Sequence, residues 1–88
     1  MLKVIPNKAF RKDVKRLRKR GYDIDKLFKV IDILASGVSI DQKYKPHPLK
    51  GNWKPSWDLH IAPDWILIYE LTDEAVYLVR TGTHADLF

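Results

Sequence analysis

Three histidines are the side chains of this sequence best suited to chemistry near neutral pH. His47 stands between two prolines, His60 follows Asp58 at a spacing of two, and His84 precedes Phe88 by four residues. Imidazole has an ordinary pKa of about 6.5, so a neutral histidine can accept a proton while a charged one donates a proton. Histidines acting in pairs suit phosphodiester cleavage, although any one of them alone is more often a surface or hydrogen-bonded side chain.

A metal site is the weaker chemical interpretation of these residues. The histidines are separated by 13 and 24 positions, which match no His-Glu-x-x-His or similar signature, and Asp64 is the only obvious further ligand. Cysteine is absent, which excludes a disulfide framework, a thiolate zinc site, an iron–sulfur cluster and a cysteine nucleophile. We therefore expect acid–base chemistry that uses neither a metal nor a cofactor.

Other side chains could complete such a site, and each also has a structural explanation. Arg80 ends an apolar strand, where it could be a snorkelling surface residue or a bidentate phosphate clamp facing the open side of a sheet. Asp64 could shape a turn after Pro63, or orient the imidazole of His60. Phe88 either docks on the core and fixes the tail or packs against substrate. A base could stack on one of the tryptophans that the core does not use: Trp53, Trp57 or Trp65.

The charge of the chain is unevenly distributed. The net charge is +5, but residues 1–29 hold eleven basic and three acidic side chains, whereas residues 30–88 hold five basic and eight acidic ones. Residues 8–20 contain only one acid, Asp13, against eight basic side chains, which exceeds what solubility requires. This segment predicts a phosphate-backbone contact surface made of Lys8, Arg11, Lys12, Lys15, Arg16, Arg18, Lys19 and Arg20.

The first half of the sequence predicts two helices that form a hairpin. Residues 8–20 carry a narrow apolar stripe at helical spacing, and Asn7 can cap their first turn. The second helix is expected to start at Asp23 or Asp25 and to stop near Gly37, with apolar side chains again at helical spacing.

The remaining segments predict strands and loops. Residues 2–5 form a short strand that Pro6 ends, and residues 39–55, with three prolines, form an ordered but irregular crossing segment. Residues 81–88 are expected to be a tail folded back over the end of the sheet, too short for a strand or a full helix. Alternating hydrophobicity predicts an antiparallel meander from residues 57–61, 65–70 and 75–80.

These elements predict a single domain over residues 1–88. It is an α+β domain in which an N-terminal strand joins a mainly antiparallel sheet ending in the three-stranded meander. The two-helix hairpin packs on one face of the sheet, and the opposite face stays open as a docking surface. No apolar run approaches the ~18 residues that span a membrane, so a cytoplasmic protein without a membrane partner is expected.

Three segments carry a resemblance to a known family: KPHPLKGNW, HIAPDWILIYEL and VRTGTHADLF. In them the sequence resembles the YafQ branch of the RelE-like toxins of bacterial type II toxin–antitoxin systems. The similarity runs nearly end to end, although the N-terminal helices match only in pattern. It implies a RelE-like fold and a metal-independent endoribonuclease that enters the ribosomal A site and cuts the mRNA there, inhibiting translation.

The resemblance also implies the roles of particular residues. His47 would be the general base toward the 2′-OH and His84 the general acid toward the leaving 5′ oxygen, although the two roles could be reversed. His60 and Asp64 would position RNA or relay a proton, and Arg80 would stabilise the charge of the phosphorane. Trp65 and Phe88 would line the site or stack on the RNA. The family positions are then His47, His60, Asp64, Trp65, Arg80, His84 and Phe88.

The partners implied by the resemblance are the ribosome with its A-site mRNA and a cognate antitoxin, acidic and DinJ-like. Operator DNA would be bound only through the toxin–antitoxin complex. Two other functions fit the residues themselves: a non-catalytic RNA- or DNA-binding module that uses the basic helix, and an interaction protein that uses the open sheet face. Cleavage of ribosome-bound mRNA would distinguish the toxin from both.

Overall fold

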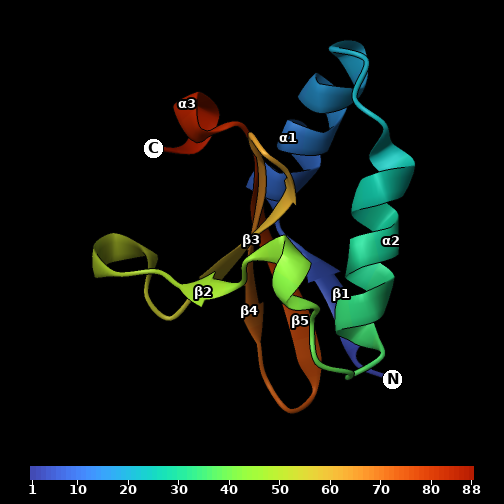
Figure 1. Cartoon of the computed structure of the whole chain (residues 1–88), viewed down its shortest axis with the longest axis vertical. Helices are drawn as coiled ribbons and strands as arrows, with labels where there is room; N and C mark the ends of the chain where they lie inside the picture. The colour runs from blue at the N-terminus through green and yellow to red at the C-terminus, as the bar shows by residue number, and fades with distance from the viewer.

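Two helices cover one face of a five-stranded sheet (Figure 1). The computed structural model describes all residues, 1–88. The helices are α1 (Lys8–Lys19), α2 (Ile24–Ala35) and a short α3 (His84–Leu87). The strands are β1 (Lys3–Pro6), β2 (His47–Pro48), β3 (Trp57–Ala62), β4 (Trp65–Leu71) and β5 (Ala75–Gly82). None of the helices has the length and hydropathy needed to cross a membrane.

The two long helices begin at the capping residues that the sequence offers. The side chain of Asn7 accepts a hydrogen bond of 2.8 Å from the Phe10 amide at the start of α1. At the start of α2, Asp23 accepts one from the amide of Asp25. Both helices bury one apolar stripe against the sheet, and their charged residues other than Asp13 lie at least partly in solvent.

The sheet has the strand order β1-β5-β4-β3-β2. Strands β2 to β5 pair antiparallel, whereas β1 pairs parallel with β5, from Lys3 opposite Ala75 to Pro6 opposite Leu78. The pairs β3–β4 and β4–β5 form the predicted meander. The α+β prediction and the mainly antiparallel sheet are therefore confirmed.

The sheet separates two hydrophobic clusters. The larger cluster joins α1 and α2 to side chains such as Leu59, Leu67 and Leu78 on the helix-covered face. On the other face, Ile66 and Ile68 of β4 pack with Leu87 of α3, and Leu49, Trp53 and Val79 lie around them. This second face, which we call the open face, is covered only in part, by α3 and by the segment around β2 (Figure 1).

Three local features differ from the sequence prediction. Residues 39–55 are not wholly irregular, because His47 and Pro48 pair with β3 as a fifth strand and two 3-10 turns flank them. Strand β5 continues to Gly82, and the tail contains a helical turn capped by Thr83. The third feature is a bulge at Val79, where β5 advances two residues while β4 advances one.

Candidate active site

A row of paired residues crosses the open face. His47 of β2 lies opposite Asp58 of β3, Asp58 opposite Ile68 of β4, and Ile68 opposite Arg80 of β5. Directly paired residues of neighbouring strands share a face, so the side chains of this row leave the sheet on the open side. The next row contains His60. The bulge at Val79 matters here, because strict alternation after Leu78 would place Arg80 on the helix-covered face.

The three histidines, far apart in sequence, form a line above this face. The ring centroids of His47 and His60 are 6.5 Å apart, and those of His60 and His84 are 5.5 Å apart. His84 reaches this position because α3 folds back over the sheet. The structure thus brings together the three residues that the sequence predicted as proton donors and acceptors.

His47 has one ring nitrogen engaged by the protein. Its Nδ1 lies 3.1 Å from the carbonyl oxygen of Lys45 and 3.0 Å from Oδ1 of Asp58. With hydrogen on Nδ1, the ring donates to the carbonyl of Lys45, and Nε2 is left as an acceptor. This is the tautomer that a general base requires.

Asp58 lies beneath the histidines and is the residue that sequence reasoning missed. Its side chain is only 5% exposed, and its Oδ1 has the close contact with His47 Nδ1 but no hydrogen bond; the Nδ1 of His60 is also buried without a hydrogen-bond partner. Burial raises the pKa of Asp58, while His47, His60 and His84 oppose that rise. The signal was present, because Asp58 and His60 are two residues apart on one strand and therefore share a face.

His84 is held by Asp64 through two hydrogen bonds. The Oδ1 of Asp64 accepts from the His84 backbone amide at 3.0 Å and from its ring Nδ1 at 2.6 Å. With Nδ1 bound to the carboxylate, Nε2 is the ring nitrogen left for a substrate. Asp64 therefore orients an imidazole, as one interpretation of the sequence allowed, but that of His84 instead of His60.

The tail that carries His84 is fixed from α1. Arg20 donates to Asp86 from Nη1 at 2.8 Å and from Nη2 at 3.2 Å, and Asp86 closes a capping box with Thr83. The hydrogen bonds from Arg20 hold the pKa of Asp86 well below its usual range. Gly82 eases this close approach, since a Cβ there would lie only 3.0 Å from Oδ2 of Asp86.

Phe88 does not itself dock on the core, and its ring stays accessible beside the site. The neighbouring Leu87 anchors the tail in the open-face cluster, while the Phe88 ring remains 58% exposed. This ring meets Trp53 edge to face, with centroids 5.6 Å apart, and lies 6.4 Å from the ring of His84. An exposed aromatic ring beside the histidine line can contact a nucleobase.

Trp65 is not brought to the site. Its side chain is 3% exposed in the cluster beneath α1 and α2, its Nε1 donates to Thr81 at 3.0 Å, and its ring meets Tyr22 edge to face. The substrate contact that the resemblance implies for Trp65 is therefore not supported by its position. Its alternation with Ile66 places it on the helix-covered face, and the general preference of tryptophan for the core prevails.

Arg80 is on the open face, but part of its guanidinium is already occupied. Its Nε and Nη2 donate to Asp13 of α1 at 2.6 and 3.0 Å, and these hydrogen bonds raise the pKa of Arg80. The side chain remains 28% exposed. Arg80 is thus neither a free surface residue nor an unoccupied clamp.

The basic residues of α1 divide into two groups. Arg16 contacts Asp13 and Arg20 contacts Asp86, so these two have partners within the chain. The other residues of the predicted surface are exposed and form no ion pair in the chain: Lys8, Arg11, Lys12, Lys15, Arg18 and Lys19.

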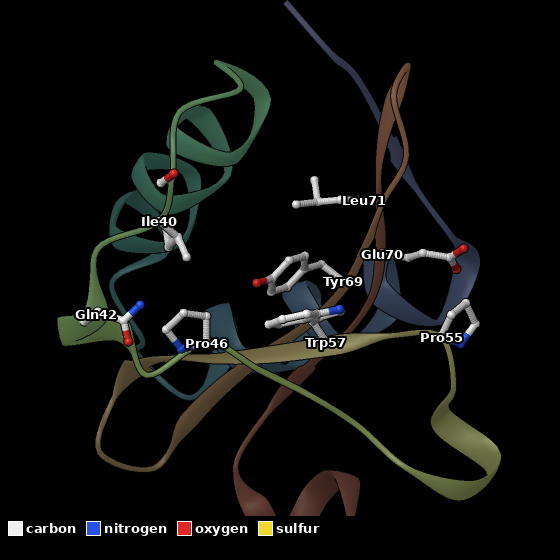
Figure 2. A pocket seen from close by; sticks show the side chains of 9 residues that line it. Ile40, Gln42, Pro46, Pro55, Trp57, Tyr69, Glu70 and Leu71 are labelled. Carbon is white, nitrogen blue, oxygen red and sulfur yellow. The ribbon is translucent and has the colours of Figure 1, made fainter.

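The largest cavity lies away from the histidines. It measures about 370 Å³ and opens between the segment around Ile40, the start of β3 and the end of β4, where Trp57 and Tyr69 point into it (Figure 2). Tyr69 belongs to the cluster on the helix-covered face, so this cavity is on the opposite side of the sheet from His60. The candidate active site is therefore an open surface and not an enclosed pocket.

Asp64 should keep its charge in acid longer than an ordinary aspartate does. The backbone and ring hydrogen bonds from His84 lower the pKa of Asp64. Its contribution to stability is then complete above about pH 3.9 and is lost as the pH falls through the lowered folded-state value. The ¹³C carboxyl shift should titrate with a midpoint below about 3.9. In His84→Ala the midpoint should return part of the way, because the backbone donor remains; an ordinary midpoint in the unsubstituted protein would contradict the contact.

Comparison with known proteins places the site in a family context. The family model described as bacterial toxin of type II toxin–antitoxin system, YafQ, matches residues 2–88. The mRNA interferase toxin YafQ of Escherichia coli K12 is 48% identical over 80 residues, which cover 90% of this chain and 87% of that protein.

Solved structures agree with this match along the whole chain. The E. coli DinJ–YafQ complex contains a chain with 43% identity and a TM-score of 0.92, and the match covers 100% of this chain and 99% of that one. A metal-bound toxin from Helicobacter pylori has 41% identity and a TM-score of 0.91, with 100% of both chains covered.

Proposed function

This chain belongs to the YafQ family of bacterial toxins of type II toxin–antitoxin systems, and on that basis we propose that it is a ribosome-dependent endoribonuclease acting on A-site mRNA. The observation that carries the proposal is the line of His47, His60 and His84 on the open face. Two of these rings have Nδ1 engaged by an acceptor in the protein, which leaves Nε2 for the substrate. A binding module has no need of this arrangement.

The proposed reaction is an internal transfer within the RNA. His47 takes the proton of the 2′-OH, and the 2′ oxygen forms a bond to the adjacent phosphorus. The bond from phosphorus to the 5′ oxygen breaks, and His84 gives that oxygen a proton. The products are a 2′,3′-cyclic phosphate and a 5′-OH, so no protein nucleophile is consumed. His60 and Asp58 lie between His47 and His84. Either of them can position the RNA or relay a proton.

Charge developing on the phosphorane is stabilised by Arg80, whose Nη1 makes no hydrogen bond within the chain. Metal-bound relatives exist, but in this chain no group of three or more His, Cys, Asp or Glu side chains is arranged to hold an ion. The steps proposed here use only side chains and the RNA itself.

The ribosome supplies what a surface site lacks. A site without an enclosing pocket has few contacts with which to fix the 2′-OH in line with the scissile bond, whereas the ribosomal A site already holds the codon. We propose that the exposed cations of α1 contact ribosomal RNA. The antitoxin partner is proposed to be DinJ-like and acidic, since a YafQ chain is found in complex with DinJ, and operator DNA is bound only through such a complex.

Primer-extension mapping on purified ribosomes tests this function. Protein that has been stripped of metal with EDTA and then freed of the chelator should still cut the A-site codon on programmed ribosomes, and the same RNA free in solution should be cleaved poorly. Growth arrest on expression without the antitoxin should accompany this result. Binding to ribosomes with intact mRNA would instead favour the non-catalytic RNA-binding function, and loss of cleavage by the metal-stripped protein, restored by adding back a metal ion, would contradict the metal-independent scheme.

Charge reversal on α1 should weaken ribosome binding in a salt-dependent way. Lys12, Lys15 and Lys19 are exposed and lie at helical spacing, so their replacement by glutamate removes up to three phosphate contacts without breaking an internal pair. The slope of log K against log salt should fall by about one per lysine. The matched control reverses three exposed lysines elsewhere: Lys3, Lys26 and Lys29. An equal loss of ribosome affinity in both variants would show that the contact surface is not specific to α1.

A further inference from the structure

The single acid of the basic helix occupies an unusual position. Asp13 is surrounded on α1 by lysines and arginines, yet its side chain is only 2% exposed. A buried carboxylate is costly unless it is hydrogen-bonded, and this one accepts four hydrogen bonds. The donors are Arg16 Nη2 at 2.6 Å, Arg80 Nε at 2.6 Å, Arg80 Nη2 at 3.0 Å and the Thr81 amide at 3.1 Å.

Asp13 continues the edge of the sheet where β1 stops. Strand β1 pairs with β5 only as far as Pro6 opposite Leu78. Three residues later along β5, the carboxylate takes the place of a neighbouring strand by accepting from the Thr81 amide. The same oxygen, Oδ2, accepts from Arg80 Nε. One rigid group therefore fixes both the backbone of β5 and the side chain that follows the bulge.

The hydrogen bonds to Asp13 determine which edge of the Arg80 guanidinium is available. The group presents five N–H donors in a planar fork, and the Nε–Nη2 edge is bound to the carboxylate in a bidentate pair. The Nη1 donors and the second hydrogen of Nη2 remain, on a partly exposed side chain at the β5 end of the row of paired residues that begins with His47. Because Arg16 also contacts Asp13, the three-residue cluster keeps a net positive charge toward a phosphate.

We propose that Asp13 is the positioning residue for Arg80: it holds the guanidinium by one edge so that the opposite edge meets the scissile phosphate. The proposal rests on the endoribonuclease function given above. It assigns Asp13 a role through another residue, since no atom of Asp13 would touch the RNA.

A double-mutant cycle separates this role from a merely structural one. Single-turnover cleavage is measured on programmed ribosomes at saturating protein for the unsubstituted chain, Asp13→Asn, Arg80→Gln and the double variant. Arg80→Gln should slow cleavage by about 10²- to 10³-fold, as removal of one charge-stabilising donor does elsewhere. Asp13→Asn should slow it by about 10- to 100-fold through misplacement of the guanidinium, with the half-saturating concentration unchanged.

In the Arg80→Gln background, Asp13→Asn should lower the cleavage rate further by less than about threefold, because its effect passes through Arg80. Effects that multiply fully would overturn the proposal, as would cleavage by Asp13→Asn at the rate of the unsubstituted chain. The matched control is Asp32→Asn, the same chemical change at an exposed position of α2. If the unsubstituted chain itself does not cut ribosome-bound mRNA, it is the proposed function that fails.

Thermal unfolding shows whether Asp13→Asn folds. If it does not fold, the variant Arg80→Lys tests the proposal in its place. Lysine retains the charge at this partly exposed position but has no second edge, so an ammonium bound to Asp13 is turned away from the RNA. Its cleavage rate should fall to within a few-fold of that of Arg80→Gln. An unimpaired Arg80→Lys variant would overturn the proposal, because charge alone would then suffice.

Discussion

Replacement of His84 by alanine should slow cleavage of ribosome-bound mRNA by about 10²- to 10⁴-fold, the usual contribution of a positioned general acid. The fold should not change, because the side chain is 54% exposed and α3 is capped by Thr83. The hydrogen bond from the backbone amide to Asp64 also survives the substitution. Primer extension with purified ribosomes gives the rate, and thermal unfolding gives the stability.

The pH dependence of the rate would identify the role. Loss of a general acid removes the decline of the rate at high pH, whereas loss of a general base removes the decline at low pH. We expect the first change in His84→Ala and the second in His47→Ala. Phe28→Ala, which removes an exposed ring from α2, is the control. Unchanged cleavage by His84→Ala would end the acid–base scheme, and exchanged pH profiles would reverse the two assignments.

Truncation of Leu67 to alanine should destabilise the domain by about 2–5 kcal/mol. Leu67 is completely buried in β4, the central strand, and packs in the cluster beneath α1 and α2. The loss combines the transfer free energy of the removed methyl and methylene groups with the cavity that they leave. The free energy of unfolding of a small domain is about 5–15 kcal/mol in total, so the variant should be near the limit of folding.

Leu71→Ala is the matched control, since it makes the same change in the same strand at a position that is 49% exposed. Urea denaturation should place its free energy of unfolding within about 0.5 kcal/mol of that of the unsubstituted chain. Equal losses in the two variants would show that burial in the cluster is not what stabilises β4. Cleavage by Leu67→Ala should decline in proportion to the folded fraction, unlike that by His84→Ala.

The elements with strong local signals were predicted well from the sequence. Helices α1 and α2 have caps and apolar stripes at helical spacing, and the meander has alternating side chains between short turns. The family prediction is likewise confirmed by the match over residues 2–88. These signals act over a few residues, which is why a single sequence contains them.

The features that escaped prediction depend on partners distant in sequence. Strand β2 consists of His47 and Pro48, too short to show any period, and exists because β3 lies beside it. The turn of α3 requires Arg20 to hold Asp86, a pair separated by 66 residues. No glycine, proline or other turn residue in the sequence indicates the bulge at Val79. This bulge nevertheless determines the face from which the Arg80 side chain leaves the sheet.

The sequence predicted most residues of the candidate site but few of the contacts between them. The histidines and Asp64 do assemble, and Phe88 lies beside them, whereas Trp65 is in the core. The contributions of Asp58 and Asp13 were missed for opposite reasons. Asp58 was noticed only as a neighbour of His60, and Asp13 was noticed only as an exception among cations; their burial is a tertiary property that spacing does not reveal.

The parallel pairing of β1 with β5 has a consequence for the order of events during synthesis. Lys3 leaves the ribosome long before its partner Ala75, and α1 emerges without the strand on which it packs. Closing so long a loop is entropically unfavourable and slow, so docking of β1 should be among the last steps of folding. The nascent chain therefore has no organised His84, Arg80 or α3 while most of its length is being translated. A ribosome making this protein has passed the codons of β5 before any of its product can act on mRNA.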